Sequence, residues 1–254
     1  MKICDFSRVL NKAAIVVLAF IVFLPVGDMA FAEGNDFAQC RQHFANGSPP
    51  VIQRQQDMQP RALCFEAFAI LHSGKSRTPI YVAERLNREI LEEKINRSDH
   101  FYEEARLPRA ERATLEDYRV SGFDRGHMAP AADMGTEEAM AQSFSLANIV
   151  PQAPINNRKA WAKIEKDTRK YVMRAAGDVY VITGPVYEAN PSTIGAGKVW
   201  VPQHLFKLVY DPSSRRAWVH WLDNTDEARV GKPISYRELV QRSGIDFLPG
   251  YALP

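Results

Sequence analysis

The chain has 254 residues and carries 32 lysine and arginine residues against 30 aspartate and glutamate residues, a formal net charge of +2. This near balance excludes any inference of a partner class from net charge. The length is enough for one domain with a substantial core and is short for two.

Residues 1–32 have the pattern of an export signal. Three basic residues precede an uncharged run over residues 13–24, and Ala30-Phe31-Ala32 fits a small-x-small cleavage site. The alternative is a membrane anchor, but the run is shorter than the roughly 20 apolar residues that span a bilayer. We therefore expect cleavage before Glu33, no membrane insertion of the remaining chain, and a periplasmic or secreted protein.

Two cysteines lie outside the predicted signal, Cys40 and Cys64. In an oxidising compartment such a pair is expected to form a disulfide, and the alternative is two free buried thiols. Closing a loop of about 25 residues would stabilise the fold by on the order of 3 kcal/mol in the chain-entropy model. The bond would tie an N-terminal extension, residues 33–75, to a domain over residues 76–254.

The first predicted elements are short. Residues 46–60 are rich in Gln, Ser and Pro, which indicates a surface loop. The apolar residues 65–73 fit a short helix or a strand, and the pattern does not decide between them. Residues 79–82 have the composition of a strand, and the polar residues 103–118 predict irregular structure.

A helix and a strand are expected in the middle of the chain. Thr136 is the expected N-cap of a helix that reaches about Ala147. Ile149-Val150 follows as a strand, and the prolines at positions 151 and 154 interrupt regular structure after it.

The last third of the chain predicts one long helix and several strands. The helix runs from about Arg158 to Ala176, with Asn157 as its N-cap and Gly177 as its stop. Three strand-like runs follow, over residues 179–183, residues 199–210 with a break near Pro202, and residues 217–222. Because most of the late strands are separated by hairpin-length gaps, we expect an α+β fold with a mainly antiparallel central sheet and flanking helices.

The long helix has one apolar face and one basic stripe when its residues are placed 100° apart. The apolar side, which we expect to be buried, carries Asn157, Trp161, Ile164, Glu165, Thr168, Tyr171, Val172 and Ala175. The opposite side carries Lys159, Lys163, Lys166 and Lys170. We interpret the stripe as a solvated face, with a nucleic-acid clamp as the alternative.

Asn157 and Glu165 are polar groups on the apolar side of this helix. Leaving either without a partner would cost about 1–3 kcal/mol, so something polar must face them. One interpretation is that Asn157 caps the helix and Glu165 pairs with an arginine; the other is that both border a hydrated metal site. Eight residues of helix separate them by about 12 Å along the axis, so Glu165 is better suited to hold metal-bound water than to share an ion with Asn157.

The order of polar motifs is the most specific signal in the sequence. Asp124-Arg125-Gly126-His127 is followed by Asn148-Ile149-Val150-Pro151-Gln152, and then by Asn157, Trp161 and Glu165. This combined pattern resembles the DNA/RNA non-specific endonucleases, which are ββα-metal (His-Me finger) nucleases. The similarity covers roughly residues 80–210, and it implies that the fold contains a ββα-metal active-site motif.

The resemblance implies a role for four polar residues of the pattern. His127 falls on the family's general base, Asn157 on its magnesium ligand, and Glu165 on the residue that holds water. Asn148 falls on a further asparagine of the site. Asn156 is a second candidate for the metal ligand, but Asn157 keeps the family's spacing of nine residues from Asn148 and eight to Glu165.

The resemblance also implies which residues meet the substrate. Arg97 falls on the family's phosphate-binding arginine, with Arg88 nearby as an alternative. Asp124, Arg125 and Gly126 complete the signature, Asp124 among the catalytic residues and Arg125 among the substrate-binding ones.

The same residues suit phosphodiester hydrolysis on chemical grounds. A neutral histidine can take a proton from water at neutral pH, which is the task for His127, and Gly126 would let the backbone approach the substrate. Magnesium keeps several waters and uses few protein ligands, which suits the single amide oxygen of Asn157; manganese is the other ion considered. Arg97 would offset phosphate charge, and 5′-phosphate ends are expected. No base-reading motif is visible, so weak sequence preference on DNA and RNA is expected.

Two rival functions remain open from the sequence. A zinc hydrolase could use His127 with Asp124 or Asp133, although no CxxC or HxxxH pair supports a closed zinc site. An exported nucleic-acid-binding protein could keep the fold without catalysis. A homodimer or an inhibitor protein as partner is left undecided by the sequence.

Overall fold

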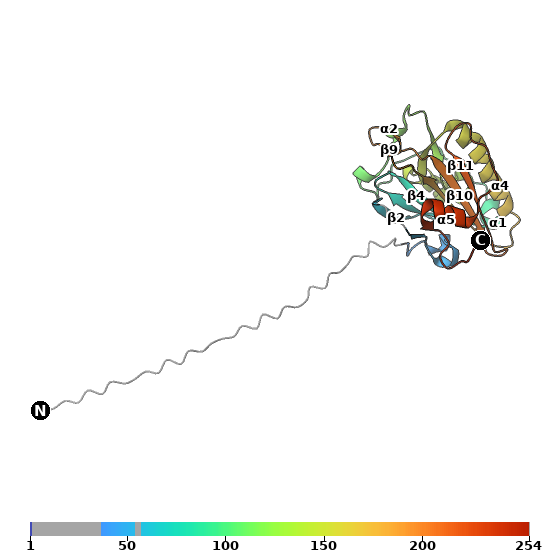
Figure 1. Cartoon of the computed structure of the whole chain (residues 1–254), viewed down its shortest axis with the longest axis horizontal. Coiled ribbons are helices and arrows are strands. Elements are labelled where there is room, and N and C mark those ends of the chain that lie inside the picture. The colour runs from blue at the N-terminus through green and yellow to red at the C-terminus, as the bar shows by residue number, and fades with distance from the viewer. Residues whose placement is uncertain (2–36, 54–56, 254) are drawn as a thin grey trace. The chain divides into compact units, whose positions relative to one another are not determined.

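Six antiparallel strands form the centre of the fold, in the spatial order β11-β10-β7-β4-β3-β2 (Figure 1). These strands are β2 (Pro60–Cys64), β3 (Phe68–Ser73), β4 (Thr78–Leu86), β7 (Val179–Val186), β10 (His204–Asp211) and β11 (Arg216–Asp223). The structure, a computed structural model, describes residue 1 and residues 37–53 and 57–253. Apart from Met1, the predicted signal over residues 1–32 lies outside the described residues. The predicted α+β class with a mainly antiparallel sheet is confirmed.

Shorter elements surround this sheet. The helices are α1 (Arg88–Glu92), α2 (Leu115–Tyr118), α3 (Glu137–Ser143), a π-helix (Asn156–Trp161), α4 (Ala162–Val172) and α5 (Tyr236–Ser243). The 3-10 turns are η1 (Arg41–His43), η2 (Ala45–Gly47), η3 (Arg109–Glu111), η4 (Ala131–Asp133) and η5 (Leu146–Asn148). Three antiparallel strand pairs are β1 (Val51–Ile52) with β12 (Ile245–Asp246), β5 (Asp124–His127) with β6 (Ile149–Gln152), and β8 (Thr193–Ile194) with β9 (Val199–Trp200). Among the described residues, no helix is long and apolar enough to cross a membrane.

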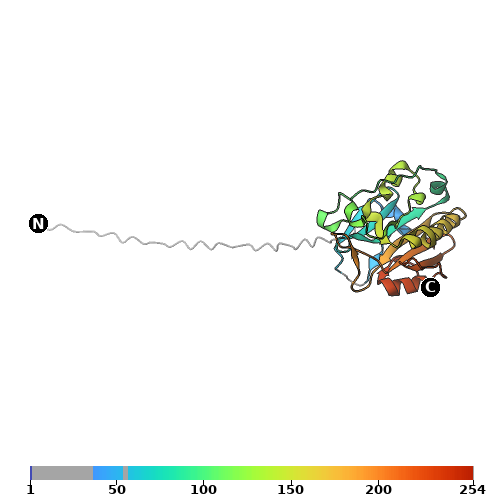
Figure 2. The same ribbon diagram turned by 90° about the horizontal axis from the view of Figure 1, so that it is seen from above.

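Both faces of the central sheet are buried. Successive side chains of a strand point to opposite faces, so Val82 packs with Trp161 and Ile164 on one side while Tyr81 packs with Leu239 of α5 on the other. Helix α4 therefore covers one face and α5 the other, as the two views show (Figures 1 and 2). Burial on both faces explains why these strands are nearly continuous apolar runs in the sequence.

The structure assigns the undecided segment 65–73 to a strand, β3, because it pairs with β2 and β4 along its length. Thr136 is the N-cap of α3, as predicted, since its Oγ1 accepts a hydrogen bond from the Ala139 backbone N–H at 3.0 Å. The helix ends at Ser143, however, and not near Ala147, because the chain turns there to enter β6.

The long helix differs from its prediction at both ends. It begins as a π-helical turn over Asn156–Trp161, so Asn157 lies inside the helix and is not its N-cap. The α-helical part ends at Val172, four residues before the predicted end at Ala176. The residues after Val172 are needed to connect this helix to β7, which starts at Val179 in the central sheet.

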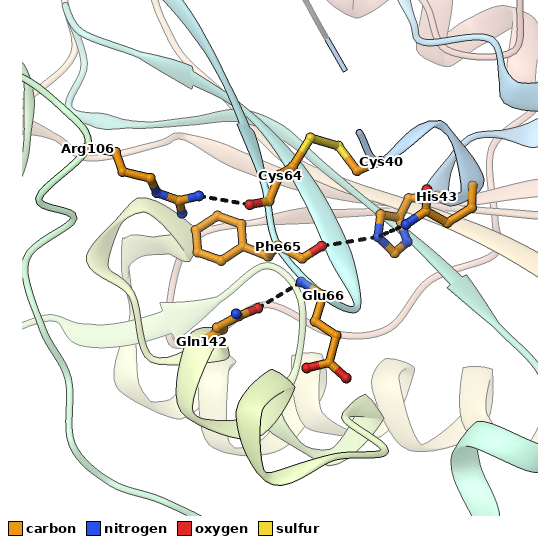
Figure 3. Close-up of a disulfide and its surroundings, with 8 residues drawn as sticks. Cys40, His43, Cys64, Phe65, Glu66, Arg106 and Gln142 are labelled. Atoms are coloured by element: carbon orange, nitrogen blue, oxygen red, sulfur yellow. Dashed lines mark hydrogen bonds between the residues drawn. A yellow bond between two sulfur atoms is a disulfide. The ribbon is translucent and has the colours of Figure 1, made fainter. Parts of the chain in front are cut away.

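The predicted disulfide between Cys40 and Cys64 is present, with Cα atoms 5.6 Å apart. Figure 3 shows how the segment after Cys64 is held. The Phe65 carbonyl accepts a hydrogen bond from His43 Nε2 at 3.4 Å, and the Cys64 carbonyl accepts one from Arg106 Nη1 at 2.8 Å (Figure 3). The predicted extension, residues 33–75, contributes β2 and β3 to the central sheet, so the predicted boundary at residue 76 falls within the β3–β4 hairpin.

Candidate active site

The candidate site is built on the β5–β6 pair and the helix that follows it. Asp124 of β5 lies opposite Gln152 of β6, and His127 lies opposite Ile149. The chain then enters the π-helix within a few residues, at Asn156. This ββα arrangement brings the polar residues of the sequence motif to one place, because β5 carries both Asp124 and His127 and the helix returns beside Asp124.

His127 is held between two aromatic rings. Its ring centroid lies 5.4 Å from that of Phe101 and 4.9 Å from that of Phe144. Its Nε2 atom is buried and has no hydrogen-bond partner among the described residues. Burial, and to a smaller extent the charge of Arg97, lower the pKa of His127 to about 3, although the charge of Asp99 acts in the opposite direction. The imidazole is therefore neutral near pH 7 and can accept a proton.

Asn148 supports the chain that follows His127. It is fully buried, its Oδ1 accepts a hydrogen bond from the Ala129 N–H at 2.9 Å, and its Nδ2 donates to the carbonyls of Ala129 and Ser143, both at 2.9 Å. Its own carbonyl accepts from the Met128 N–H at 3.0 Å. Because both ends of its amide bind the backbone, Asn148 fixes the strand end that carries His127.

The structure gives a packing reason for the glycine at position 126. A Cβ atom at this position would lie 2.1 Å from Oε1 and 2.6 Å from Cβ of Gln152. The Gln152 side chain therefore occupies the space that a larger residue at position 126 would need. The absent side chain thus makes room for Gln152, and the expectation that Gly126 also lets the backbone approach a substrate stays a prediction.

Asp124 orients the start of the helix. Its Oδ2 accepts a hydrogen bond from Asn157 Nδ2 at 2.9 Å, and its two oxygens accept from Arg158 at 2.8 and 2.6 Å. Because the Asn157 amide nitrogen faces Asp124, its Oδ1 faces away, and the structure records no hydrogen bond to that oxygen from any described residue. This oxygen is the group at the site best suited to hold a divalent cation such as magnesium.

The structure distinguishes the two adjacent asparagines. Asn156 is fully buried, its Oδ1 accepts a hydrogen bond from Gln152 Nε2 at 2.9 Å, and its Nδ2 donates to the Asp223 carbonyl at 2.7 Å. Asn156 therefore ties the helix to β6 and β11 with both ends of its side chain. Of the two candidates for a metal ligand, only Asn157 keeps its amide oxygen available.

Glu165 lies one turn after Trp161 on the helix face that packs against the sheet. Burial raises the pKa of Glu165 to about 7; Lys207 lowers it, Asp133 raises it, and Arg169 and Arg97 lower it. The alternative expectation, an ion pair between Glu165 and an arginine, is not what the described residues show: Arg169 Nη1 pairs with Asp133 Oδ1 at 2.8 Å. Glu165 is thus a half-buried residue whose charge depends on its neighbours.

Arg97 and Arg125 each lie over one of the two aromatic rings that contact His127. The Arg97 guanidinium lies 5.1 Å from the Phe144 ring centroid, and the Arg125 guanidinium lies 4.4 Å from the Phe101 ring centroid. Both arginines are exposed, and Arg97 also pairs with Asp99 at 3.0 Å. Exposed cations beside a neutral histidine can bind a phosphate.

The structure also bears on three further predictions: Arg88 as the phosphate-binding residue, the basic stripe of the helix, and the zinc site. Arg88, the alternative to Arg97, is on α1 and pairs with Glu92 at 2.7 Å. The four lysines of the basic stripe are exposed, and two of them, Lys163 and Lys170, form ion pairs with Asp167. For the zinc alternative, the described part of the chain contains no group of three His, Cys, Asp or Glu residues that could hold a metal ion.

Sequence reasoning missed several residues of the site. Phe101 and Phe144 gave no signal, because their contacts with His127 arise only in the folded chain. Arg158 directly follows Asn157, and its pairing with Asp124 was not expected. Lys207 did carry a signal, since a lysine interrupts the apolar run of β10 and is only 1% exposed.

Comparisons with known proteins show which family the chain is similar to. The chain matches the DNA/RNA non-specific endonuclease family over residues 50–252. It is 37% identical over 155 residues to mitochondrial endonuclease G of Bos taurus, a match that covers 56% of this chain and 52% of the relative. It is 35% identical over 170 residues to nuclease C1 of Cunninghamella echinulata var. echinulata, which covers 61% of this chain and 67% of that protein. The chain thus spans about half the length of bovine endonuclease G.

A solved structure shows the same fold. The crystal structure of the EndoG/EndoGI complex aligns with a TM-score of 0.70 at 23% sequence identity, and the alignment covers 85% of this chain and 92% of that chain. At this identity the likeness concerns the fold alone. The family match extends over most of the chain and includes every residue of the ββα site. The chain therefore belongs to the DNA/RNA non-specific endonuclease family.

Proposed function

We propose that the protein is a metal-dependent, largely sequence-non-specific endonuclease that hydrolyses phosphodiester bonds of DNA and RNA. The observation that carries this proposal is that two suitable groups lie on the same ββα motif. His127 offers a buried, unpartnered and neutral nitrogen, and Asn157 offers an amide oxygen that Asp124 turns away from itself. A base and a cation-binding oxygen are what hydrolysis of a phosphodiester requires.

In this proposal His127 accepts a proton from a water molecule as the water oxygen attacks phosphorus. The bond from phosphorus to the 3′-oxygen breaks, and the leaving oxygen takes a proton from a solvent water molecule, which leaves a 5′-phosphate and a 3′-hydroxyl. Arg97 and Arg125, exposed beside His127, bind the phosphate oxygens and offset their charge.

Asn157 Oδ1 would hold a magnesium ion, or a manganese ion, together with water and substrate oxygens. When bound, the ion would supply stabilisation of the negative charge that develops during hydrolysis. Glu165 accepts hydrogen bonds from water on the inner side of the site, and Asp124 keeps the Asn157 side chain in its orientation.

We also propose that the protein acts outside the cytoplasm, in the periplasm or after secretion. The export pattern of residues 1–32 supports this location. The Cys40–Cys64 disulfide supports it as well, because such bonds persist in oxidising compartments.

Cleavage of supercoiled plasmid and of a long RNA by the purified protein tests the function. With magnesium we expect both substrates to be cut and the new ends to carry 5′-phosphate; with EDTA we expect neither to be cut. A folded His127→Ala variant should be slower by about 10²–10⁴-fold, because it lacks the proton acceptor. Binding of DNA without cleavage by the unaltered, magnesium-supplied protein would show that the chain is a binding protein of this fold.

A further inference from the structure

A cluster of charged side chains lies between the central sheet and α4, beneath the proposed site. We call it the buried charge cluster, and its members are Glu84, Asp133, Glu165, Arg169 and Lys207. Lys207 of β10 lies opposite Thr183 of β7, and Thr183 lies opposite Val82 of β4. This register places Lys207 on the sheet face that α4 covers, and Glu84 lies two residues beyond Val82 on that face.

Lys207 lies under the helical turn that carries Glu165. It is 1% exposed, its Nζ donates a hydrogen bond to Thr183 Oγ1 at 2.7 Å, and Nζ lies 5.7 Å from the Trp161 ring centroid. Trp161 and Glu165 are four residues apart and share one face of the helix. The ammonium group is therefore close to the Glu165 carboxyl, and it is the cation that acts most strongly on it.

The other cations near Glu165 are engaged or exposed. Arg169, on α4, pairs with Asp133 of η4 at 2.8 Å. Arg97, in the loop after α1, is exposed and pairs with Asp99. Among the described residues Lys207 forms no ion pair, and its one hydrogen bond goes to a neutral hydroxyl. Its charge is therefore the one available to compensate Glu165.

Glu84 completes the charge balance of the cluster. It is fully buried on β4, and neither of its carboxyl oxygens has a hydrogen-bond partner among the described residues. Burial raises the pKa of Glu84 well above its ordinary value, Asp133 and Glu165 raise it further, and Lys207 and Arg169 lower it. Three carboxyl groups face two cations, so one carboxyl keeps its proton, and Glu84 is the one without a donor to stabilise its charge.

We propose that Lys207 is a positioning residue of the active site, whose buried ammonium group favours the carboxylate form of Glu165 while Glu84 of the same cluster stays a neutral acid. The inference rests on the proposed role of Glu165 as the residue that holds water. A buried carboxylate loses its hydration and takes up a proton unless a cation compensates it. A protonated Glu165 would accept hydrogen bonds from water less well.

The test is a carboxyl ¹³C NMR titration of protein labelled at glutamate, with the Glu165 signal assigned by Glu165→Gln. Lys207→Met should raise the midpoint of the Glu165 titration by about one pH unit or more, since a nearby opposite charge has effects of that size. Glu84→Gln, which mimics the neutral acid, should leave the midpoint in place. An unchanged midpoint in Lys207→Met, or an equal shift in Glu84→Gln, would overturn the inference.

Activity gives a second measurement. The acid limb of the pH–rate profile for plasmid cleavage should move to higher pH in Lys207→Met and stay unchanged in Glu84→Gln, whereas a purely structural loss would lower the rate at every pH. Should Lys207→Met fail to fold, the same comparison is made between Asp133→Asn and Asp133→Asn/Lys207→Met, which removes one buried charge of each sign. The NMR titration does not need cleavage, so a protein that cuts nothing would refute the proposed function and still test Lys207.

Discussion

Two adjacent asparagines at the start of the helix have different tasks: Asn156 holds the helix in place, and Asn157 is the proposed metal ligand. Asn156 uses both ends of its amide inside the protein, on Gln152 and on the Asp223 carbonyl. Asn157 uses only its nitrogen, on Asp124. The two residues have the same chemistry, so their different surroundings make them a matched pair for mutation.

Asn157→Ala should lower magnesium-dependent cleavage by at least about 100-fold, because it removes the proposed ligand; the only side-chain hydrogen bond it loses among the described residues is the one to Asp124. Its melting temperature should stay close to that of the unaltered protein. Asn156→Ala should instead lower the free energy of unfolding by about 1–3 kcal/mol, because it leaves buried groups without partners. Thermal unfolding and plasmid cleavage, measured on both variants, check this; equal loss of activity in two equally stable variants would contradict it.

The sequence predicted which residues form the candidate site, but it did not predict the contacts that each of them makes. The motif around His127, with Asn148, Asn157 and Glu165, followed from a family resemblance that the family match confirms. The partners did not follow, because they depend on pairing across strands far apart in the chain. No local pattern indicates that Gly126 makes room for Gln152.

At the scale of elements, the disulfide holds a region that also supports the site. Cys64 ends β2, and its carbonyl accepts a hydrogen bond from Arg106. Arg106 pairs with Glu104 at 2.7 Å, and Glu104 accepts a hydrogen bond from Ser145 at 3.0 Å. Ser145 directly follows Phe144, one of the two rings against His127. A continuous set of contacts thus joins the bond to the aromatic support of the site.

Removing the disulfide should therefore affect stability more than the chemical step. A Cys40→Ala/Cys64→Ala variant should lose about 3 kcal/mol of unfolding free energy, as expected for a closed loop of this length. Urea unfolding of the oxidised protein, the reduced protein and the double variant measures it. A stability equal to that of the oxidised protein would show that the contacts of β2 and β3 suffice.

Element types were more predictable than element boundaries. The strands of the late part of the chain are close to their predicted ranges, because apolar runs and hairpin-length gaps mark them. The π-helical turn at Asn156–Trp161 was not predictable from periodicity, since it depends on the bonds that Asn156 makes to β6 and β11. Such turns are frequent at functional sites.

For the whole molecule, several histidines are buried in the neutral state. Burial lowers the pKa of His43, His72 and His220 to about 4, against an ordinary value of 6.5. The unfolded chain therefore takes up protons below about pH 6.5, while the folded chain does not until about pH 4. Their stabilising contribution is present above pH 6.5 and is lost as the pH falls through this window. The raised pKa of Glu165 has the opposite effect on the free energy of unfolding, because the folded chain binds this proton at a higher pH than the unfolded chain does.

His72→Gln isolates one of these contributions. His72 is fully buried, and its Nε2 donates a hydrogen bond to the Glu111 carbonyl at 2.8 Å, which a glutamine amide can imitate. Between pH 7.5 and pH 5 the unaltered protein should lose about 2 kcal/mol more unfolding free energy than the variant does. Urea unfolding at the two pH values gives the difference, and an identical loss in both proteins would contradict a neutral buried His72.

The most direct test of the central claim, that His127 is the proton acceptor of a metal-dependent nuclease, is chemical rescue. Plasmid nicking with magnesium is timed for the unaltered protein and for His127→Gly, with and without added imidazole. We expect a loss of about 10²–10⁴-fold in the variant and partial recovery when imidazole enters the space left between Phe101 and Phe144. Cleavage by folded His127→Gly at the rate of the unaltered protein, without imidazole, would show that His127 is not the proton acceptor.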